Sequence, residues 1–304
     1  MAEDVRGRTV LVTGGTGGIG KETARGLARL GMRVVVVGRD GDRARAAVEE
    51  LRRATGNDEV DALTADVTRQ RDVRQLADRA AGRYGAIDVL INNAGVTMSR
   101  RVLTEDGVET AFAANVLAPF LLTRDLLPAL IRAAPARVIT LTGGVPRGPI
   151  DLDNLQGERS YLGLAAYNQT KLAMMAMSYT FAERLRGSGV TLNVAYPGHA
   201  YTSMNKNLTA DTYPPAARPL VPLLRLLMPV LYGHGAAARA SRSSIHLASS
   251  EDAAALHGAY VTSRCRRAAW PAAVLDRRNR DAIWAMCEKL AGQATPEAPG
   301  VAGA

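Results

Sequence analysis

The stretch Val10-Leu-Val-Thr-Gly-Gly-Thr-Gly-Gly-Ile-Gly-Lys-Glu-Thr-Ala24 decides the fold. Its first three residues are apolar and predict a buried strand, and Lys21–Leu30 places apolar residues at helical spacing. The turn between them has the spacing Gly14-x-x-x-Gly18-x-Gly20. Glycine admits positive φ and lets a phosphate approach the backbone, where a helix N-terminus offers free N–H groups. The pattern favours a dinucleotide-binding element over a turn that only links strand to helix.

The chain has 304 residues, of which 47% are hydrophobic, which is enough for one large α/β domain or at most two small ones. The net charge is +9, but the basic residues are spread through predicted helices and aromatic residues are only 5%, so we expect no nucleic-acid partner. The sequence contains no apolar signal region and no run of roughly 18 apolar residues, so we expect a cytoplasmic protein. Cys265 and Cys287 lack metal-ligand spacing, so we expect free thiols and no metal site.

Apolar runs alternate with helical patterns along the chain. Strands are predicted at Val10–Val12, Met32–Gly38, Glu59–Ala65, Ile87–Ile91, Arg137–Gly144, Val190–Ala195 and Ala259–Thr262, with helices between them. This alternation predicts a Rossmann-like, doubly wound parallel sheet of about seven strands with helices on both faces, in a single domain over residues 1–292. Residues 293–304 are expected to be a disordered tail.

The second predicted strand ends in Gly38-Arg39-Asp40, where a dinucleotide fold places the adenosine ribose. An acidic residue directly at the strand end would bind both ribose hydroxyls and favour NAD. The guanidinium of Arg39 can instead bind a 2′-phosphate, which favours NADP. Asp40 follows directly, and an ordinary surface arginine is the other interpretation of Arg39.

Tyr167 and Lys171 are four residues apart on a predicted helix and therefore share a face. The ordinary tyrosine pKa is about 10, and a neighbouring ammonium is expected to lower it and favour the phenolate. Tyrosine could then exchange protons with a substrate oxygen. Lysine also carries three donors that can reach ribose hydroxyls. An exposed helix pair without chemistry is the alternative.

In this order, Thr13-Gly-x-x-x-Gly-x-Gly20, Asn92-Asn-Ala-Gly95 and Tyr167-x-x-x-Lys171 resemble the short-chain dehydrogenase/reductase family. The resemblance covers roughly residues 6–290. Within the family, the chain looks like the retinol-dehydrogenase-like branch, because of the motifs at 13–24, 38–40 and 153–156 and the tail around Trp284. The resemblance implies an NADP-dependent oxidoreductase acting on an alcohol or carbonyl of an apolar substrate, with NADPH preferred over NADH.

The resemblance also implies roles for individual residues. Asp66 would reach the adenine amino group, and Asn115 would hold a proton-relay water. Tyr167 would be the general acid or base, with Lys171 lowering its pKa and holding the ribose. The implied cofactor-binding set is Gly14, Thr16, Gly18, Ile19, Gly20, Arg39, Asp66, Val67, Asn93, Ala94, Gly95, Tyr167, Lys171, Pro197, Gly198, Ala200 and Thr202.

The chain departs from the family at the serine that follows the fifth strand and hydrogen-bonds the substrate oxygen. Alignment on Arg137-Val-Ile places Gly143 there, whereas counting back from Tyr167 places Thr142 there. We favour Thr142, because its hydroxyl can still donate. If neither position acts, a non-redox enzyme of cyclase or isomerase type, or a cofactor-binding protein, becomes the alternative function.

Residues 203–235 combine a polar, Pro-rich part with a very apolar part around 219–232. The family places a substrate cover here, so we expect a lid or pocket wall over an apolar substrate. Membrane contact is not favoured, because prolines and a single arginine make a poor amphipathic surface helix. The resemblance further implies a homodimer or homotetramer that pairs through the helices bearing Asn115 and Tyr167.

Overall fold

The computed structural model describes residues 4–143, 148–198, 209–213, 219, 221 and 235–292. Its sheet has the strand order β3-β2-β1-β4-β5-β6-β7-β8. The strands are β1 (Thr9–Thr13), β2 (Arg33–Gly38), β3 (Val60–Thr64), β4 (Val89–Asn92), β5 (Ala136–Leu141), β6 (Val190–Ala195), β7 (Tyr260–Val261) and β8 (Arg267–Ala268). The first seven are parallel, and β8 adds a short antiparallel strand beyond the predicted seven. The predicted doubly wound fold is confirmed.

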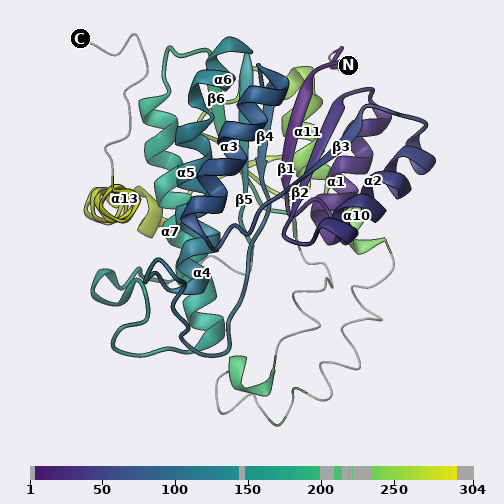
Figure 1. Cartoon of the computed structure of the whole chain (residues 1–304). Coiled ribbons are helices and arrows are strands. Elements are labelled where there is room, and N and C mark those ends of the chain that lie inside the picture. Colours follow the sequence, from purple (N-terminus) through teal and green to yellow (C-terminus); the bar gives the residue numbers. More distant parts are fainter. Residues whose placement is uncertain are drawn as a thin grey trace.

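Helices cover both faces of this sheet (Figure 1). One layer contains α1 (Gly18–Arg29), α2 (Gly41–Thr55), α10 (Ala236–Ala240) and α11 (Arg242–Ser249). The other contains α3 (Gln70–Tyr84), α4 (Thr110–Phe112), a π-helical turn (Ala113–Leu117), α5 (Ala118–Asp125), α6 (Leu127–Arg132) and α7 (Gly163–Arg184). The chain runs outward from β1 to β3 and then returns to β4 on the other side of β1. The crevice between β1 and β4 is therefore the switch point at which such sheets bind ligands.

The two ends of α2 have local causes. The Asp40 carboxylate accepts a hydrogen bond from the backbone N–H of Arg43 at 3.0 Å and so caps the start of α2. The same helix ends at Gly56, whose φ of +67° is the left-handed conformation that glycine adopts without strain. β1 is buried at all five positions, as its apolar sequence predicts.

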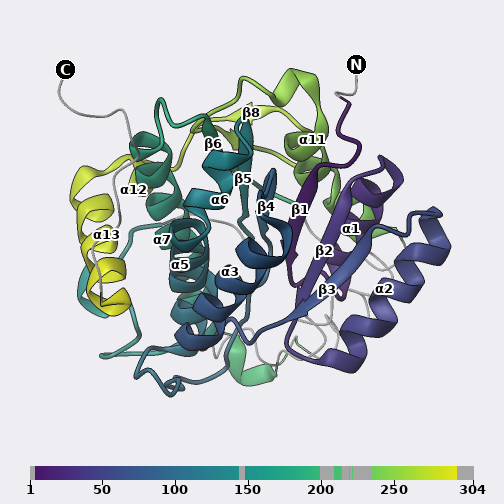
Figure 2. The ribbon, with the colours of Figure 1, turned by 45° about the horizontal axis from the view of Figure 1, so that its top comes forward.

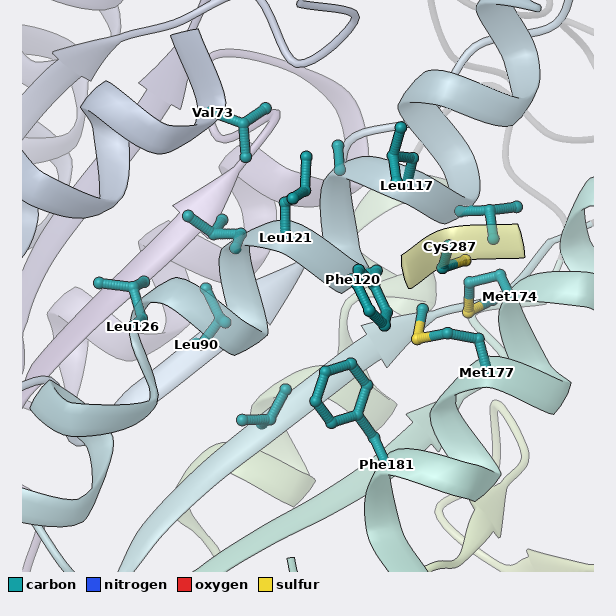
Figure 3. Close-up of a cluster of buried hydrophobic side chains, with 14 of the residues drawn as sticks. Val73, Leu90, Leu117, Phe120, Leu121, Leu126, Met174, Met177, Phe181 and Cys287 are labelled. Carbon is teal, nitrogen blue, oxygen red and sulfur yellow. The ribbon is translucent and has the colours of Figure 1, made fainter. Parts of the chain in front are cut away.

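The C-terminal helix α13 (Arg277–Ala291) packs on the outside of α7, as Figure 2 shows. Its Trp284 ring contacts Phe120 of α5 and Phe181 of α7, with centroids 5.2 and 4.8 Å apart. Figure 3 shows the two phenylalanines meeting beside Cys287 of α13. α13 thus covers part of the outer surface of α5 and α7. The homo-oligomer expected through these helices stays a prediction.

Several sequence expectations fall on residues outside the described ranges. These include the disordered tail at 293–304 and most of the expected lid at 203–235. Both cysteines are free thiols, as expected. Among the described residues, no helix is long and apolar enough to cross a membrane.

Candidate active site

The glycine turn between β1 and α1 is shaped for close approach. Gly14 and Gly18 have φ of +65° and +54°, and a Cβ added to Gly20 would overlap the Gly14 carbonyl oxygen and Nδ2 of Asn93. α1 starts at Gly18 with no acidic residue in its first turn, so no carboxylate of that turn competes for its first N–H groups. Ile19 packs into the core beneath it. We call the turn from Gly14 to Gly20, together with the first N–H groups of α1, the glycine cradle. Its shape fits the pyrophosphate of a dinucleotide.

Residues after β4 form the other wall of the crevice. Thr13 Oγ1 accepts hydrogen bonds from the backbone N–H groups of Asn93 and Ala94 at 3.0 and 3.1 Å. The Asn93 side chain donates to the Thr13 carbonyl at 2.8 Å. Ala94 and Val67 also line a small hollow between β4 and α3. The Asn-Asn-Ala-Gly motif therefore fixes the glycine turn to β4 at the switch point.

At the end of β2, Thr16 lies against Gly38, where a Cβ would come within 2.6 Å of the threonine methyl group. Arg39 is exposed. Asp40 is already engaged by its hydrogen bond to the Arg43 N–H, which lowers the pKa of this carboxyl. Asp66 accepts hydrogen bonds from the backbone and hydroxyl groups of Thr68 at 2.9 and 2.8 Å. Its predicted contact with adenine stays a prediction.

Tyr167 and Lys171 lie together on α7, and both are buried. Lys171 Nζ donates to the Leu141 carbonyl at 3.2 Å and lies 5.8 Å from the centroid of the Tyr167 ring. Burial raises the pKa of Tyr167 to about 12, with a further contribution from Tyr196, and lowers the pKa of Lys171 to about 8. The expected lowering of the tyrosine pKa is therefore wrong, because burial of the phenol raises this pKa and the Lys171 amine donates its hydrogen bond to the Leu141 carbonyl instead.

Two residues after β5 were candidates for the family's serine position. A Cβ added to Gly143 would overlap the Tyr167 hydroxyl and would lie 3.8 Å from Cε of Lys171. Thr142 is buried, and its hydroxyl has no hydrogen-bond partner within the described residues. A side chain at position 143 would thus point toward the Tyr167 hydroxyl, and glycine leaves no hydroxyl there. A catalytic role for Thr142 stays a prediction.

Asn115 sits in the π-helical turn, a deformation that often marks functional sites. Its amide exchanges two hydrogen bonds of 2.9 Å with the Val96 backbone and donates a third, also 2.9 Å, to Thr170 Oγ1. A Cβ added to Gly95 would lie 3.0 Å from Asn115 Oδ1 and 3.3 Å from Lys171 Nζ. The fold thus brings Asn115, Gly95 and Lys171 together, although they come from three segments.

The Pro197–Gly198 segment follows β6 at the same edge of the sheet. Gly198 has φ of +79°, and a Cβ there would lie 3.2 Å from the Ser263 side chain. Its backbone can therefore approach a ligand closely. Ala200 and Thr202, which the sequence also predicts as cofactor contacts, lie outside the described residues.

Glu109 is a supporting residue that the sequence reasoning missed. It is only 1% exposed, and its carboxylate accepts hydrogen bonds from the N–H groups of Ala111 and Phe112 and from the Tyr161 hydroxyl at 2.9 Å. Its own N–H donates to Gln156 at 3.0 Å. Glu109 therefore ties α4 to the irregular segment that leads into α7. The available signal was an acidic residue directly before a helix start.

Replacing Tyr161 with phenylalanine is expected to destabilise the fold by about 1–3 kcal/mol, because the buried Glu109 carboxylate loses a hydrogen-bond donor. Urea unfolding measures this loss. Tyr84→Phe is the matched control, since the Tyr84 hydroxyl donates to Asp61, which solvent and Arg83 also reach. An equal or larger loss in the control variant would contradict the role given to Glu109.

The fold and the site together define a dinucleotide-binding protein of the Rossmann type. Residues 8–212 match the family model described as short chain dehydrogenase. The chain therefore belongs to the short-chain dehydrogenase/reductase family and is an NAD(P)-dependent enzyme of that family.

Within this family, the chain is similar to retinol dehydrogenases, which confirms the branch that the sequence indicates. The chain is 36% identical to human retinol dehydrogenase 13, over 96% of this chain and 87% of that protein. It is 35% identical to mouse retinol dehydrogenase 12, over 94% and 87%.

Solved structures agree with the fold. An uncharacterised protein from Mycobacterium paratuberculosis has a TM-score of 0.75 at 27% identity and covers 97% of both chains. The Pseudomonas aeruginosa RhlG/NADP active-site complex has a TM-score of 0.63 at 27% identity, over 85% of this chain and 95% of that one.

Proposed function

We propose that the protein is an NADP-dependent oxidoreductase that interconverts a carbonyl and an alcohol on an apolar small molecule. The observation that carries this proposal is the buried Tyr167–Lys171 pair beside Gly143, at the same sheet edge as the glycine cradle. The chemistry that a bound nicotinamide would supply is a hydride for the carbonyl carbon. Tyr167 donates its hydroxyl proton to the carbonyl oxygen, and the ammonium of Lys171 stabilises the phenolate that remains.

The preference for NADP is supported by the end of β2. One carboxylate oxygen of Asp40 caps α2, whereas Arg39 is exposed and in no ion pair within the described residues. A guanidinium there suits a 2′-phosphate. Two solved relatives, the RhlG protein of Pseudomonas aeruginosa and a short chain dehydrogenase from Burkholderia cenocepacia, are complexes with NADP.

The first test is a titration of the purified protein with NADPH and NADH, followed by assays with apolar aldehydes and ketones. We expect tighter binding of NADPH and a substrate-dependent loss of its absorbance. Equal binding of both dinucleotides would contradict the NADP preference. Binding without turnover on every carbonyl would contradict the redox assignment.

We expect kcat/KM for carbonyl reduction to fall by about tenfold per pH unit above about pH 8, because Lys171 loses its proton there. The value of kcat/KM falls as the pH rises because the protonated Lys171 stabilises the developing phenolate, whereas the neutral amine does not. Tyr167 keeps its proton in this range, because its pKa is about 12. A pH profile with NADPH measures the effect, and a constant kcat/KM up to pH 10 would contradict it.

A second candidate is a non-redox enzyme of the same fold, of cyclase or isomerase type, or a cofactor-binding protein. The observation that favours it is Gly143, which presents no hydroxyl toward Tyr167. This candidate requires binding of the cofactor without its consumption. The cytoplasmic location and the apolar lid over 203–235 stay predictions from the sequence.

A further inference from the structure

Two buried polar atoms next to the reacting tyrosine have no hydrogen-bond partner, which is uncommon in a folded chain. In the described part of the chain, the side-chain atoms in this state are Arg25 Nε, Thr142 Oγ1, Asn168 Oδ1, Arg280 Nε and Trp284 Nε1. The two arginines bind carboxylates through their other guanidinium nitrogens, and the Trp284 ring packs within the contact between α13 and α7. Thr142 and Asn168 lack such an explanation, and each adjoins a residue of the site in the sequence.

Thr142 is already a candidate for contact with the reacting oxygen, so the unexplained group is the amide of Asn168. The next residue on α7, Gln169, uses both ends of its amide: Nε2 donates to the Asn154 carbonyl at 2.8 Å, and Oε1 accepts from the Asp151 N–H at 3.0 Å. Asn168 is half-buried, and its Oδ1 is buried without a donor among the described residues. A buried acceptor in this state is available to a ligand.

Asn168 lies on the side of α7 that faces the neighbouring strands β6 and β7. Tyr179 follows about three helical turns later on the same face. The Tyr179 ring packs against Trp270, which also contacts Tyr260 of β7 with centroids 5.7 Å apart. α7 begins at the carboxyl edge of the sheet, where the Tyr167 hydroxyl lies beside the end of β5. The Asn168 amide is therefore at the same edge as the reacting phenol.

The end of β6 adds a second polar side chain to this region. Val194 of β6 belongs to the buried cluster that β6 shares with α7, and alternation along the chain places Tyr196, two residues later, on the same face. Burial raises the pKa values of Tyr167 and Tyr260, and the Tyr196 phenol adds to both shifts, so it lies near both rings. The start of α7 and the end of β6 therefore place Asn168 and Tyr196 beside the reacting phenol.

The chemistry of the amide decides what kind of group it binds. The reacting carbonyl oxygen cannot satisfy Asn168 Oδ1, because both atoms are acceptors. A hydroxyl group both donates and accepts, so it pairs with this amide in either of its two orientations. A substrate without such a group would leave the buried acceptor unsatisfied, which costs binding free energy.

We propose that Asn168 is a specificity-determining residue that hydrogen-bonds a hydroxyl group of the substrate, on the carbon chain next to the reacting carbonyl. The substrate class is then a hydroxyketone or hydroxyaldehyde with an apolar chain, rather than a simple carbonyl compound. The inference deepens the proposed oxidoreductase function and rests on it. Asn168 takes no part in the proton transfer, which stays with Tyr167.

The test compares the reduction of 2-octanone with that of 1-hydroxy-2-octanone and 4-hydroxy-2-octanone. In the native chain, we expect kcat/KM to be about tenfold higher for one of the hydroxyketones, the effect of one well-made neutral hydrogen bond. Asn168→Leu and Asn168→Ala should abolish this preference and leave kcat/KM for 2-octanone nearly unchanged. Asn279→Ala is the matched control, because the Asn279 amide donates to the Ala273 carbonyl at 2.9 Å, and it should keep the preference.

Two further measurements need no turnover. Leucine is close to asparagine in size and removes the buried acceptor, so Asn168→Leu should keep or raise the Tm of the native chain. A Tm lower by more than about 3 °C would mean that the amide has a structural role and would overturn the inference. In the presence of NADPH, with which an alcohol cannot react, octane-1,2-diol or octane-2,4-diol should bind about tenfold more tightly than 2-octanol.

The outcomes separate this inference from the proposed function. If the chain reduces none of the three ketones but a diol binds more tightly than 2-octanol in an Asn168-dependent way, the redox assignment fails and the hydroxyl subsite stands. If the chain reduces all three ketones equally and binds the alcohols equally, the subsite is wrong while the reductase stands. A hydroxyl preference that survives in Asn168→Leu would also overturn the role of Asn168.

Discussion

Tyr167→Phe is expected to lower kcat for carbonyl reduction by about 10²- to 10⁴-fold, the range that general acid catalysis supplies. The substitution removes only the hydroxyl that lies against Gly143 and leaves the ring in its buried place on α7. We therefore expect the Kd for NADPH and the unfolding free energy to stay nearly unchanged. Steady-state kinetics and a cofactor titration measure the two effects separately.

Tyr179→Phe is the matched control for this experiment. Tyr179 belongs to the same helix, and its ring packs against Trp270 with centroids 5.4 Å apart. Tyr179 lies about 18 Å further along the helix axis than Tyr167, so activity should be retained. Turnover by Tyr167→Phe at more than about a tenth of the native rate would exclude this phenol as the proton donor.

Gly20→Ala has the second large expected effect. The added Cβ would overlap the Gly14 carbonyl oxygen and the Asn93 amide, so the turn has to open. Overpacking of this kind costs about 1–3 kcal/mol of stability. Because the same atoms shape the phosphate cradle, we expect NADPH binding to be lost as well. Urea unfolding and cofactor titration give the two values.

Gly82→Ala is the control, since Gly82 lies within α3 and a Cβ there has nothing within 4 Å. This variant should be neutral or stabilised by about 0.5–1 kcal/mol, because alanine is the better helix former. If Gly20→Ala bound NADPH like the native chain, the cradle would not be the cofactor site.

Gly143 is one of the two positions, with Thr142, at which the family's serine is expected. A serine there would not fit beside Tyr167 as it stands, because the first side-chain atom already overlaps the phenol. A glycine at 143 thus lets the tyrosine lie closer to the backbone after β5. Whichever group orients the substrate oxygen must come from another position, and Thr142 stays one candidate.

The local motifs could be predicted from sequence because their causes are local. The run Val10–Val12, the spacing of Gly14, Gly18 and Gly20, and the helical start at Lys21 specify a strand, a turn and a helix within one short segment. The four-residue spacing of Tyr167 and Lys171 likewise places both on one helix face. The alternation of strands and helices then predicts the doubly wound sheet, which the structure confirms.

Tertiary structure decided everything that depends on residues far apart in the chain. Burial sets the pKa values of Tyr167 and Lys171, and burial is a property of the packed fold rather than of the motif. The approach of Gly143 to the phenol depends on how α7 packs against the end of β5. Sequence patterns report periodicity and local conformation, whereas these contacts exist only once the sheet has brought separate segments to one edge.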